Sequence, residues 1–198
     1  MANHEGKTYG IDFIDPLFAV AIHIGFTHSV LDEAWFAEWR WPRGHERFDA
    51  LVLLLAFCTV VLSWVGYHRS IALKPLRAED RMGFVRFILD VVLVSLYALL
   101  LVKFKDIDAT LTLYVWIYAL FLVWDICKVR EHSQKYLASD PFGKRYRREL
   151  VTTFWFVVFL GLLLLRDHRS LADTATLVGL WVATVMYRVN KEVPILGF

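Results

Sequence analysis

The residues whose side chains could do chemistry are first found in an apolar stretch near the start of the chain. Phe13–Leu31 is long enough to cross a bilayer, which takes roughly 20 mostly apolar residues. It contains five polar side chains: Asp15, His23, Thr27, His28 and Ser29. An ionisable group inside a membrane span is costly and by default indicates a functional site. We therefore expect this stretch to face water rather than lipid.

Four residues of this stretch share one edge of the expected helix. At about 100° per residue, Pro16, Val20, His23 and Thr27 form a narrow stripe. Apolar rings can gate a pore by dewetting, and polar rings can help ions through. The stripe thus predicts an ion pathway. Imidazoles become charged between about pH 5 and 8. Acid would therefore either lower the cation conductance of this pathway or turn the pathway into a proton relay. The alternative is that His23 is packed and bonds a neighbouring helix.

The elements that must position these residues are six apolar blocks. The chain is 58% hydrophobic, above the roughly 45–50% of soluble domains. The blocks have the length of membrane spans: Phe13–Leu31, Ala50–Tyr67, Phe87–Val102, Thr110–Cys127, Val151–Leu165 and Leu171–Tyr187. They predict an all-α integral membrane protein, with residues 1–198 forming a single six-span domain. The first ten residues are polar, so we do not expect a cleaved signal peptide.

The distribution of basic residues predicts the orientation. If both termini are cytoplasmic, roughly two thirds of the 22 Lys and Arg residues lie on the cytoplasmic side. On the other side, the segment 32–49 mixes tryptophans with charges and is typical of a helix at the membrane interface. The basic segment 129–149 is next to a span, so we expect anionic lipid, and no nucleic acid, as its partner.

The orientation also groups polar residues from four spans at their cytoplasmic ends. They are Asp15, Trp64, His68, Arg86, Asp90 and Asp125. Buried charges need partners, so these side chains are predicted to form a structural polar network. The alternative is that they only anchor the spans at the interface, with their polar tips in water.

Two short motifs resemble the endolysosomal potassium channel family and its bacterial six-span relatives. Phe13-Ile14-Asp15 stands where that family has Phe-Ser-Asp, and Leu62–Arg69 resembles its second-span ending. The chain departs from the family at Ile14, which replaces Ser, and at Tyr9, which stands where the family has Arg. The resemblance implies a homo-tetramer in which four first helices line a pore for monovalent cations, potassium or protons. It also implies a bacterial inner membrane location.

By position, the resemblance makes Val20 a residue of the apolar constriction. His23 stands where the bacterial relatives have Thr. An imidazole ring at this point would alter ion selectivity.

Two other classes of function remain open. The first is a membrane redox protein that binds haem through histidines. Two of the candidate ligands, His23 and His28, share a span but lie on different faces of its helix. The other candidates lie at span ends or in loops: His68, His132 and His168. The second is a transporter or a partner subunit of a membrane complex. We see no nucleophile, phosphate loop or metal-ligand cluster, and Cys58 and Cys127 form no CxxC motif. Enzymatic activity, a metal and a cofactor are therefore not expected.

Overall fold

Most of the residues that the computed structural model describes are helical, and the described residues are 11–30, 33, 36, 38–39, 41–73, 81–135, 141–165 and 173–192. These residues form six α-helices and one π-helical segment. They are α1 (Ile11–Gly25), the π-helical η1 (Phe26–Val30), α3 (His45–Leu73), α4 (Arg81–Val102), α5 (Ile107–Lys135), α6 (Pro141–Leu165) and α7 (Asp173–Glu192). The all-helical class predicted from the sequence is confirmed.

The helices are mostly longer than the apolar blocks that predicted them. The blocks at 50–67, 87–102, 110–127 and 151–165 each lie inside one helix, which continues into polar residues. The first block, 13–31, is divided, because the helix widens to a π-helix after Gly25, and Leu31 lies outside the described residues. The sixth block begins at 171–172, also outside them, and continues in α7. Of the interfacial segment 32–49, only 33, 36, 38–39 and 41–49 are described, and α3 already begins at His45.

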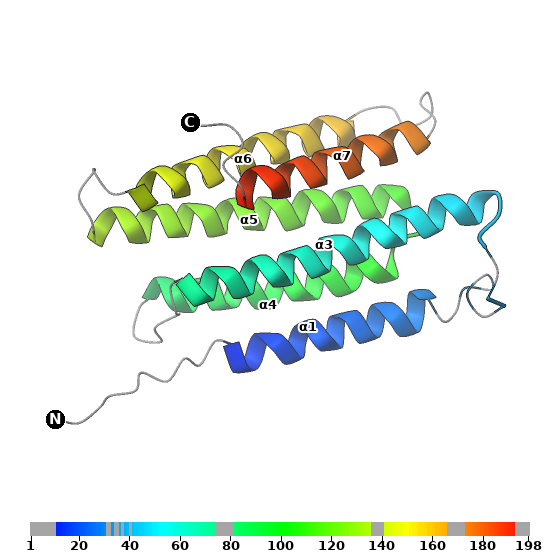
Figure 1. Cartoon of the computed structure of the whole chain (residues 1–198), viewed down its shortest axis with the longest axis horizontal. Helices are drawn as coiled ribbons and strands as arrows, with labels where there is room; N and C mark the ends of the chain where they lie inside the picture. Colours follow the sequence, from blue (N-terminus) through cyan, green and yellow to red (C-terminus); the bar gives the residue numbers. More distant parts are fainter. Residues whose placement is uncertain are drawn as a thin grey trace.

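The helices run alternately in opposite directions, side by side (Figure 1). Helix α1 packs mainly against α4, α4 also packs against α5, and α5 packs against α6. Helix α3 contacts α4, α1 and α7, while α7 also contacts α6. Helix α1 therefore lies at one margin of the bundle, and the pair α6 and α7 lies at the other. The start of α1 and the end of α7 point to the same end of the bundle (Figure 1).

Three helices are long and apolar enough to cross a membrane, judged by length and composition. They are α3 over His45–His68, α4 over Phe84–Val102 and α5 over Ile107–Arg130. The sequence predicted six spans, so this criterion is met for half of them. Helix α1 has only 15 residues before the π-helical turn, α6 begins with a run of basic residues, and α7 mixes threonines and charges into its 20 residues. For all six helices, membrane crossing itself stays a prediction.

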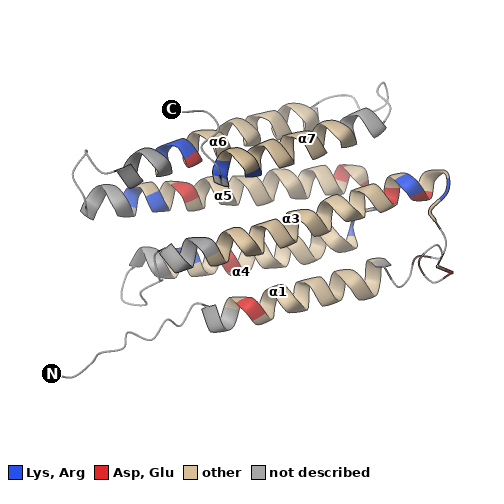
Figure 2. Ribbon diagram, viewed as in Figure 1, with Lys and Arg blue, Asp and Glu red and all other residues tan. Residues whose placement is uncertain are grey.

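The charged residues of the described chain gather at the two ends of the bundle. Figure 2 shows Lys, Arg, Asp and Glu near the helix ends, with an uncharged band between them. In the sequence, this band corresponds to runs without any of these four residue types, such as 50–67 on α3 and 109–124 on α5. A band of this kind is what the hydrocarbon core of a bilayer requires of the helices that cross it.

Tyrosines fill the interior where α5 meets its neighbours. Tyr118 is fully buried and packs edge-on against Phe156 of α6 and Tyr187 of α7, with ring centroids 4.4 and 5.0 Å apart. Tyr114 is one turn earlier, and its hydroxyl lies 2.9 Å from the Thr59 hydroxyl of α3. A buried hydroxyl without a partner is costly, so this bond helps to fix the depth of α3 against α5.

Gly25 allows α1 to approach α4 closely. A Cβ built on Gly25 would lie 2.7 Å from the Cβ of Leu101, which is fully buried. One turn later, the Ser29 hydroxyl donates to the Leu101 carbonyl oxygen. The contact therefore combines a missing side chain with a hydrogen bond across the two helices.

We expect Gly25→Ala to destabilise the protein by about 1–3 kcal/mol, because overpacking a tight contact forces its neighbours to move. Thermal unfolding of the protein in detergent measures this change. Gly161→Ala on α6 is the matched control, since a Cβ there would meet nothing within 4 Å. The control should leave the unfolding temperature unchanged or raise it slightly, because Ala favours a helix over Gly. Equal effects of the two substitutions would contradict the close-packed contact.

Candidate functional site

The outward edge of α1 carries the residues that predicted an ion pathway. Pro16, Val20 and His23 are exposed, with 52% of Val20 accessible, and Thr27 is half-buried. The opposite face of the same helix is buried against the bundle: Ile14, Phe18, Ala21, Gly25 and Ser29. The stripe is thus turned away from the other helices of its own chain. In the single chain, His23 is not the packed histidine that was the alternative.

Asp15 lies directly before Pro16 in α1, beside this edge, and is held by two side chains of α3. Its Oδ1 atom accepts a hydrogen bond from Trp64 Nε1 at 3.1 Å and lies 2.7 Å from His68 Nε2. The two α3 rings meet edge to face, with centroids 4.9 Å apart. The carboxylate and the imidazole each remain 37% exposed. The arrangement orients a carboxylate at the helix start while leaving it open to water.

Arg86 and Asp90, one helical turn apart on α4, are both buried at the same end of the bundle. The Arg86 guanidinium lies 4.7 Å from the ring centre of Trp124 on α5. Lys128 approaches the same indole at 4.1 Å. Asp90 lies within electrostatic range of both cations. Cation–π contacts of this kind stabilise a charge that has been removed from water, so this cluster joins α4 to α5.

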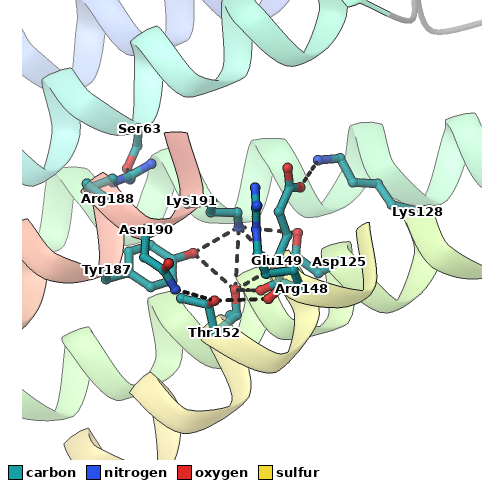
Figure 3. A network of polar contacts seen from close by, with 11 residues as sticks. Ser63, Asp125, Lys128, Arg148, Glu149, Thr152, Tyr187, Arg188, Asn190 and Lys191 are labelled. Atoms are coloured by element: carbon teal, nitrogen blue, oxygen red, sulfur yellow. Dashed lines mark hydrogen bonds and ion pairs between the residues drawn. The ribbon is translucent and has the colours of Figure 1, made fainter. Parts of the chain in front are cut away.

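Asp125 belongs to a second, more deeply buried cluster between α5, α6 and α7 (Figure 3). Lys191 Nζ lies 3.2 and 2.9 Å from the two carboxylate oxygens. The Thr153 hydroxyl donates to Asp125 Oδ2 at 2.6 Å. The Tyr187 hydroxyl lies 2.9 Å from Lys191 Nζ and 3.2 Å from the Thr153 hydroxyl. Every member therefore has at least two partners, as a buried polar network requires.

The charge of Lys191 is secured by these partners. Burial alone disfavours an ammonium group. The Asp125 carboxylate and the Tyr187 hydroxyl outweigh that effect, so that the pKa of Lys191 is raised above its ordinary value. The ammonium group therefore stays charged at neutral pH.

A second ion pair extends the Asp125 cluster along α6. Lys128 Nζ lies 3.1 Å from Glu149 Oε2, and both side chains are largely buried. On the side of α7, Asn190 donates to the Thr152 hydroxyl at 2.9 Å, and Arg188 donates to Ser63 of α3. These contacts connect four helices, α3, α5, α6 and α7 (Figure 3).

The structure places the predicted polar network in two groups, and Lys128, which contacts both Trp124 and Glu149, connects the Arg86 side with the Asp125 cluster. It brings Asp15, Trp64 and His68 together, and it places Arg86 against Trp124 near Asp90. It does not bring Asp125 to Asp15, because Asp125 faces α6 and α7. The other members of the Asp125 cluster were not singled out from the sequence: Lys128, Glu149, Thr153, Tyr187 and Lys191. The available signal was that a carboxylate at the end of an apolar run needs a cation, and Lys191 is such a cation at the end of another run.

The remaining chemistry of the described residues is limited. No group of three or more His, Cys, Asp or Glu side chains in that part of the chain lies close enough to hold a metal ion. Cys58 and Cys127 are free thiols. What the arrangement offers is an exposed helix edge with an imidazole midway and a carboxylate beside it near the start of α1. No protein-family model, curated protein or solved structure that was compared with the chain matches it.

Proposed function

We propose that this protein is an integral membrane protein whose copies associate through α1 and conduct monovalent cations along its exposed edge. The observation that carries the proposal is the exposure of Pro16, Val20 and His23 on a helix whose other face is packed. The proposal includes six membrane crossings, cytoplasmic termini and residence in the plasma membrane.

The membrane location is supported by the uncharged band across the bundle (Figure 2) and by the length and apolar composition of α3, α4 and α5. Helices α1, α6 and α7 run alongside these three (Figure 1). The segments 16–30, 150–165 and 174–187 within them carry no Asp, Glu, Lys or Arg. Neighbouring helices in a bilayer shield each other's polar side chains, so less apolar helices can cross beside apolar ones.

The exposed imidazole supports association of copies around α1. Polar and ionisable side chains in membrane spans almost always face a bundle interior or a water-filled cavity, because lipid solvates them poorly. His23 faces neither within its own chain. A ring of copies would surround a central axis with Val20, His23 and Thr27 side chains, and cyclic symmetry is the usual way in which soluble chains close such a ring. We favour a tetramer on the resemblance to the potassium channel family.

This edge and the neighbouring Asp15 offer, in order along the helix, the side chains that a cation path needs. Asp15 offers a partly exposed negative charge at the inner mouth, and such charges raise the local cation concentration. Val20 follows as an apolar constriction that can close by dewetting. His23 and Thr27 then offer polar groups in place of lost hydration water.

The proposal is tested by potassium efflux from liposomes that contain purified protein of known stoichiometry. With a potassium gradient, we expect efflux that a protonophore accelerates, because the protonophore carries the compensating charge. If protons are the permeant ion, a potassium ionophore alone should produce a pH change inside the vesicles. Vesicles that show neither signal, while their protein is folded and oligomeric, would contradict the proposal.

We expect the potassium efflux to fall in mild acid, and we expect this fall to require His23. Each imidazolium near the path repels a cation by about 1 kcal/mol even in a water-like medium at 4 Å. Two or more charges should therefore lower the flux about tenfold or more. Efflux is measured across the range between about pH 5 and 8, in which histidines titrate. His23→Ala should flatten the profile.

His28→Ala is the control for this profile, since His28 is exposed but lies in the π-helical segment, off the stripe. It should retain the acid sensitivity of the parent protein. If His23→Ala keeps the same pH profile as the parent, His23 has no part in the path.

A further inference from the structure

A groove opens at the opposite end of the bundle from the polar clusters, beside the first turns of α3. Its volume is about 970 Å³, which lies in the range of pockets that hold small ligands. Three aromatic rings lie at its rim, namely Phe36, Trp39 and Trp41. Arg47 is the one charged residue among those that line it. The groove is therefore an apolar site with a single fixed cation.

The floor of the groove is a strip of α3 that nothing else in the described chain covers completely. Leu51 and Leu54 are 44% and 51% exposed, and Phe57 continues the strip one turn further. From Ala50 to Phe57 the helix rises about 10 Å. These residues begin the apolar part of a candidate membrane span. An extended hydrocarbon chain parallel to α3 fits this strip.

The rim of the groove has the composition of a membrane interface. Trp39 and Trp41 are both 89% exposed, and Trp39 stacks on Phe36 with ring centroids 5.8 Å apart. Tryptophans are enriched at the headgroup level of bilayers. Arg47 Nε donates to the Pro42 carbonyl oxygen at 3.2 Å, which orients the guanidinium at the rim. A guanidinium matches the oxygens of a phosphate group.

We propose that this groove binds an anionic phospholipid. One acyl chain would lie against Leu51, Leu54 and Phe57, and the headgroup phosphate would lie at Arg47. The order of the residues along α3 matches the order of a lipid, with the charge at the end of the span and the apolar strip toward its middle. Two of the nearby carboxylates have partners other than Arg47: Glu46 accepts from the Arg43 backbone, and Glu33 pairs with Lys105. This inference rests on the proposed membrane location but not on ion conduction.

Native mass spectrometry of the full-length protein in detergent tests the site. The probes are phosphatidylglycerol and phosphatidylcholine with identical acyl chains, added in equal amounts. We expect phosphatidylglycerol adducts to predominate and Arg47→Gln to reduce them about tenfold, because a charge-assisted hydrogen bond is lost. Arg43→Gln is the matched control, since Arg43 is exposed nearby but does not line the groove, and it should leave the adducts unchanged. Glycerol phosphate, which has the headgroup charge without acyl chains, should not compete.

Three outcomes would overturn the proposal. The first is equal binding of the two lipids by the parent protein. The second is equal loss of adducts in Arg47→Gln and Arg43→Gln, which would indicate unspecific attraction to basic residues. The third is efficient disulfide formation between two copies of the Leu54→Cys variant, made in a Cys58→Ala background. Such a disulfide would show that a second copy of the protein occupies the groove. None of these outcomes depends on flux, so a failure of the lipid site is distinguishable from a failure of the proposed conduction.

Discussion

Val20→Ser is expected to raise potassium efflux from liposomes about tenfold, which corresponds to about 1.4 kcal/mol off the barrier to permeation. Val20 is the apolar member of the exposed α1 edge, and about half of its surface is accessible. In the proposed oligomer, a ring of these side chains keeps water out of the narrowest part of the path. A hydroxyl in their place allows the constriction to stay wet, so that ions cross more often.

Val182→Ser is the matched control for this substitution. Val182 lies on α7, at the other margin of the bundle, and its exposure of 58% is close to that of Val20. It should leave the efflux unchanged, because the proposal places it away from the path. If the two substitutions change the efflux equally, or if neither changes it, the α1 edge is not the constriction.

Asp125→Asn is expected to have the largest effect on stability, about 3–5 kcal/mol, because it leaves the buried ammonium of Lys191 without its counter-charge. The carboxylate is almost fully buried and accepts from both Lys191 and Thr153. Unfolding of the detergent-solubilised protein measures the change. Asp15→Asn is the control for a hydrogen-bonded carboxylate in contact with solvent, because Asp15 and His68 are each 37% exposed. It should cost less than about 1 kcal/mol.

The pH dependence of this cluster has a definite sign. The pKa of Lys191 is raised in the folded protein. The stability that the charged Lys191 contributes is therefore fully present below the ordinary pKa of a lysine. It is lost only as the pH rises through the pKa that Lys191 has in the folded protein. We therefore expect the difference between Asp125→Asn and the parent to stay constant across neutral pH. A difference that disappears at neutral pH would show that Lys191 is not charged there.

The sequence was sufficient to predict the helices because their apolar runs are long. The blocks at 50–67 and 110–127 lie well inside α3 and α5. The edge of α1 was also predictable, since helical periodicity alone assigns Val20 and His23 to one side. The buried residues on the opposite side, such as Phe18 and Ala21, agree with that periodicity.

The partners of Asp125 were not predictable from the sequence. Thr153 is 28 residues away and Lys191 is 66 residues away, so their contact depends on how far α6 and α7 slide along α5. Neither hydrophobic periodicity nor the distribution of charges fixes that register. The groove at Arg47 was missed for a similar reason, because its rim comes from the segment before α3, whose path the residue pattern does not specify.

The number of apolar blocks in the sequence exceeds the number of helices that are long and apolar enough to cross a membrane, and the difference has a physical reason. Residue patterns gave six apolar blocks, whereas only α3, α4 and α5 meet the length and composition of a span on their own. Helix α1 fails because its regular part ends at Gly25. A helix that crosses the membrane alone must present an apolar surface to lipid on all sides, whereas a helix in a bundle must do so only on the side that faces lipid.

Thiol modification of Val20→Cys in a Cys58→Ala and Cys127→Ala background tests most directly whether the α1 edge lines a cation path. A membrane-impermeant, positively charged methanethiosulfonate reagent is added to liposomes while potassium efflux is recorded. We predict that it blocks the efflux through Val20→Cys and that dithiothreitol reverses the block. The same reagent should have no effect on Val182→Cys. Efflux through Val20→Cys that continues unchanged after complete labelling would contradict the account.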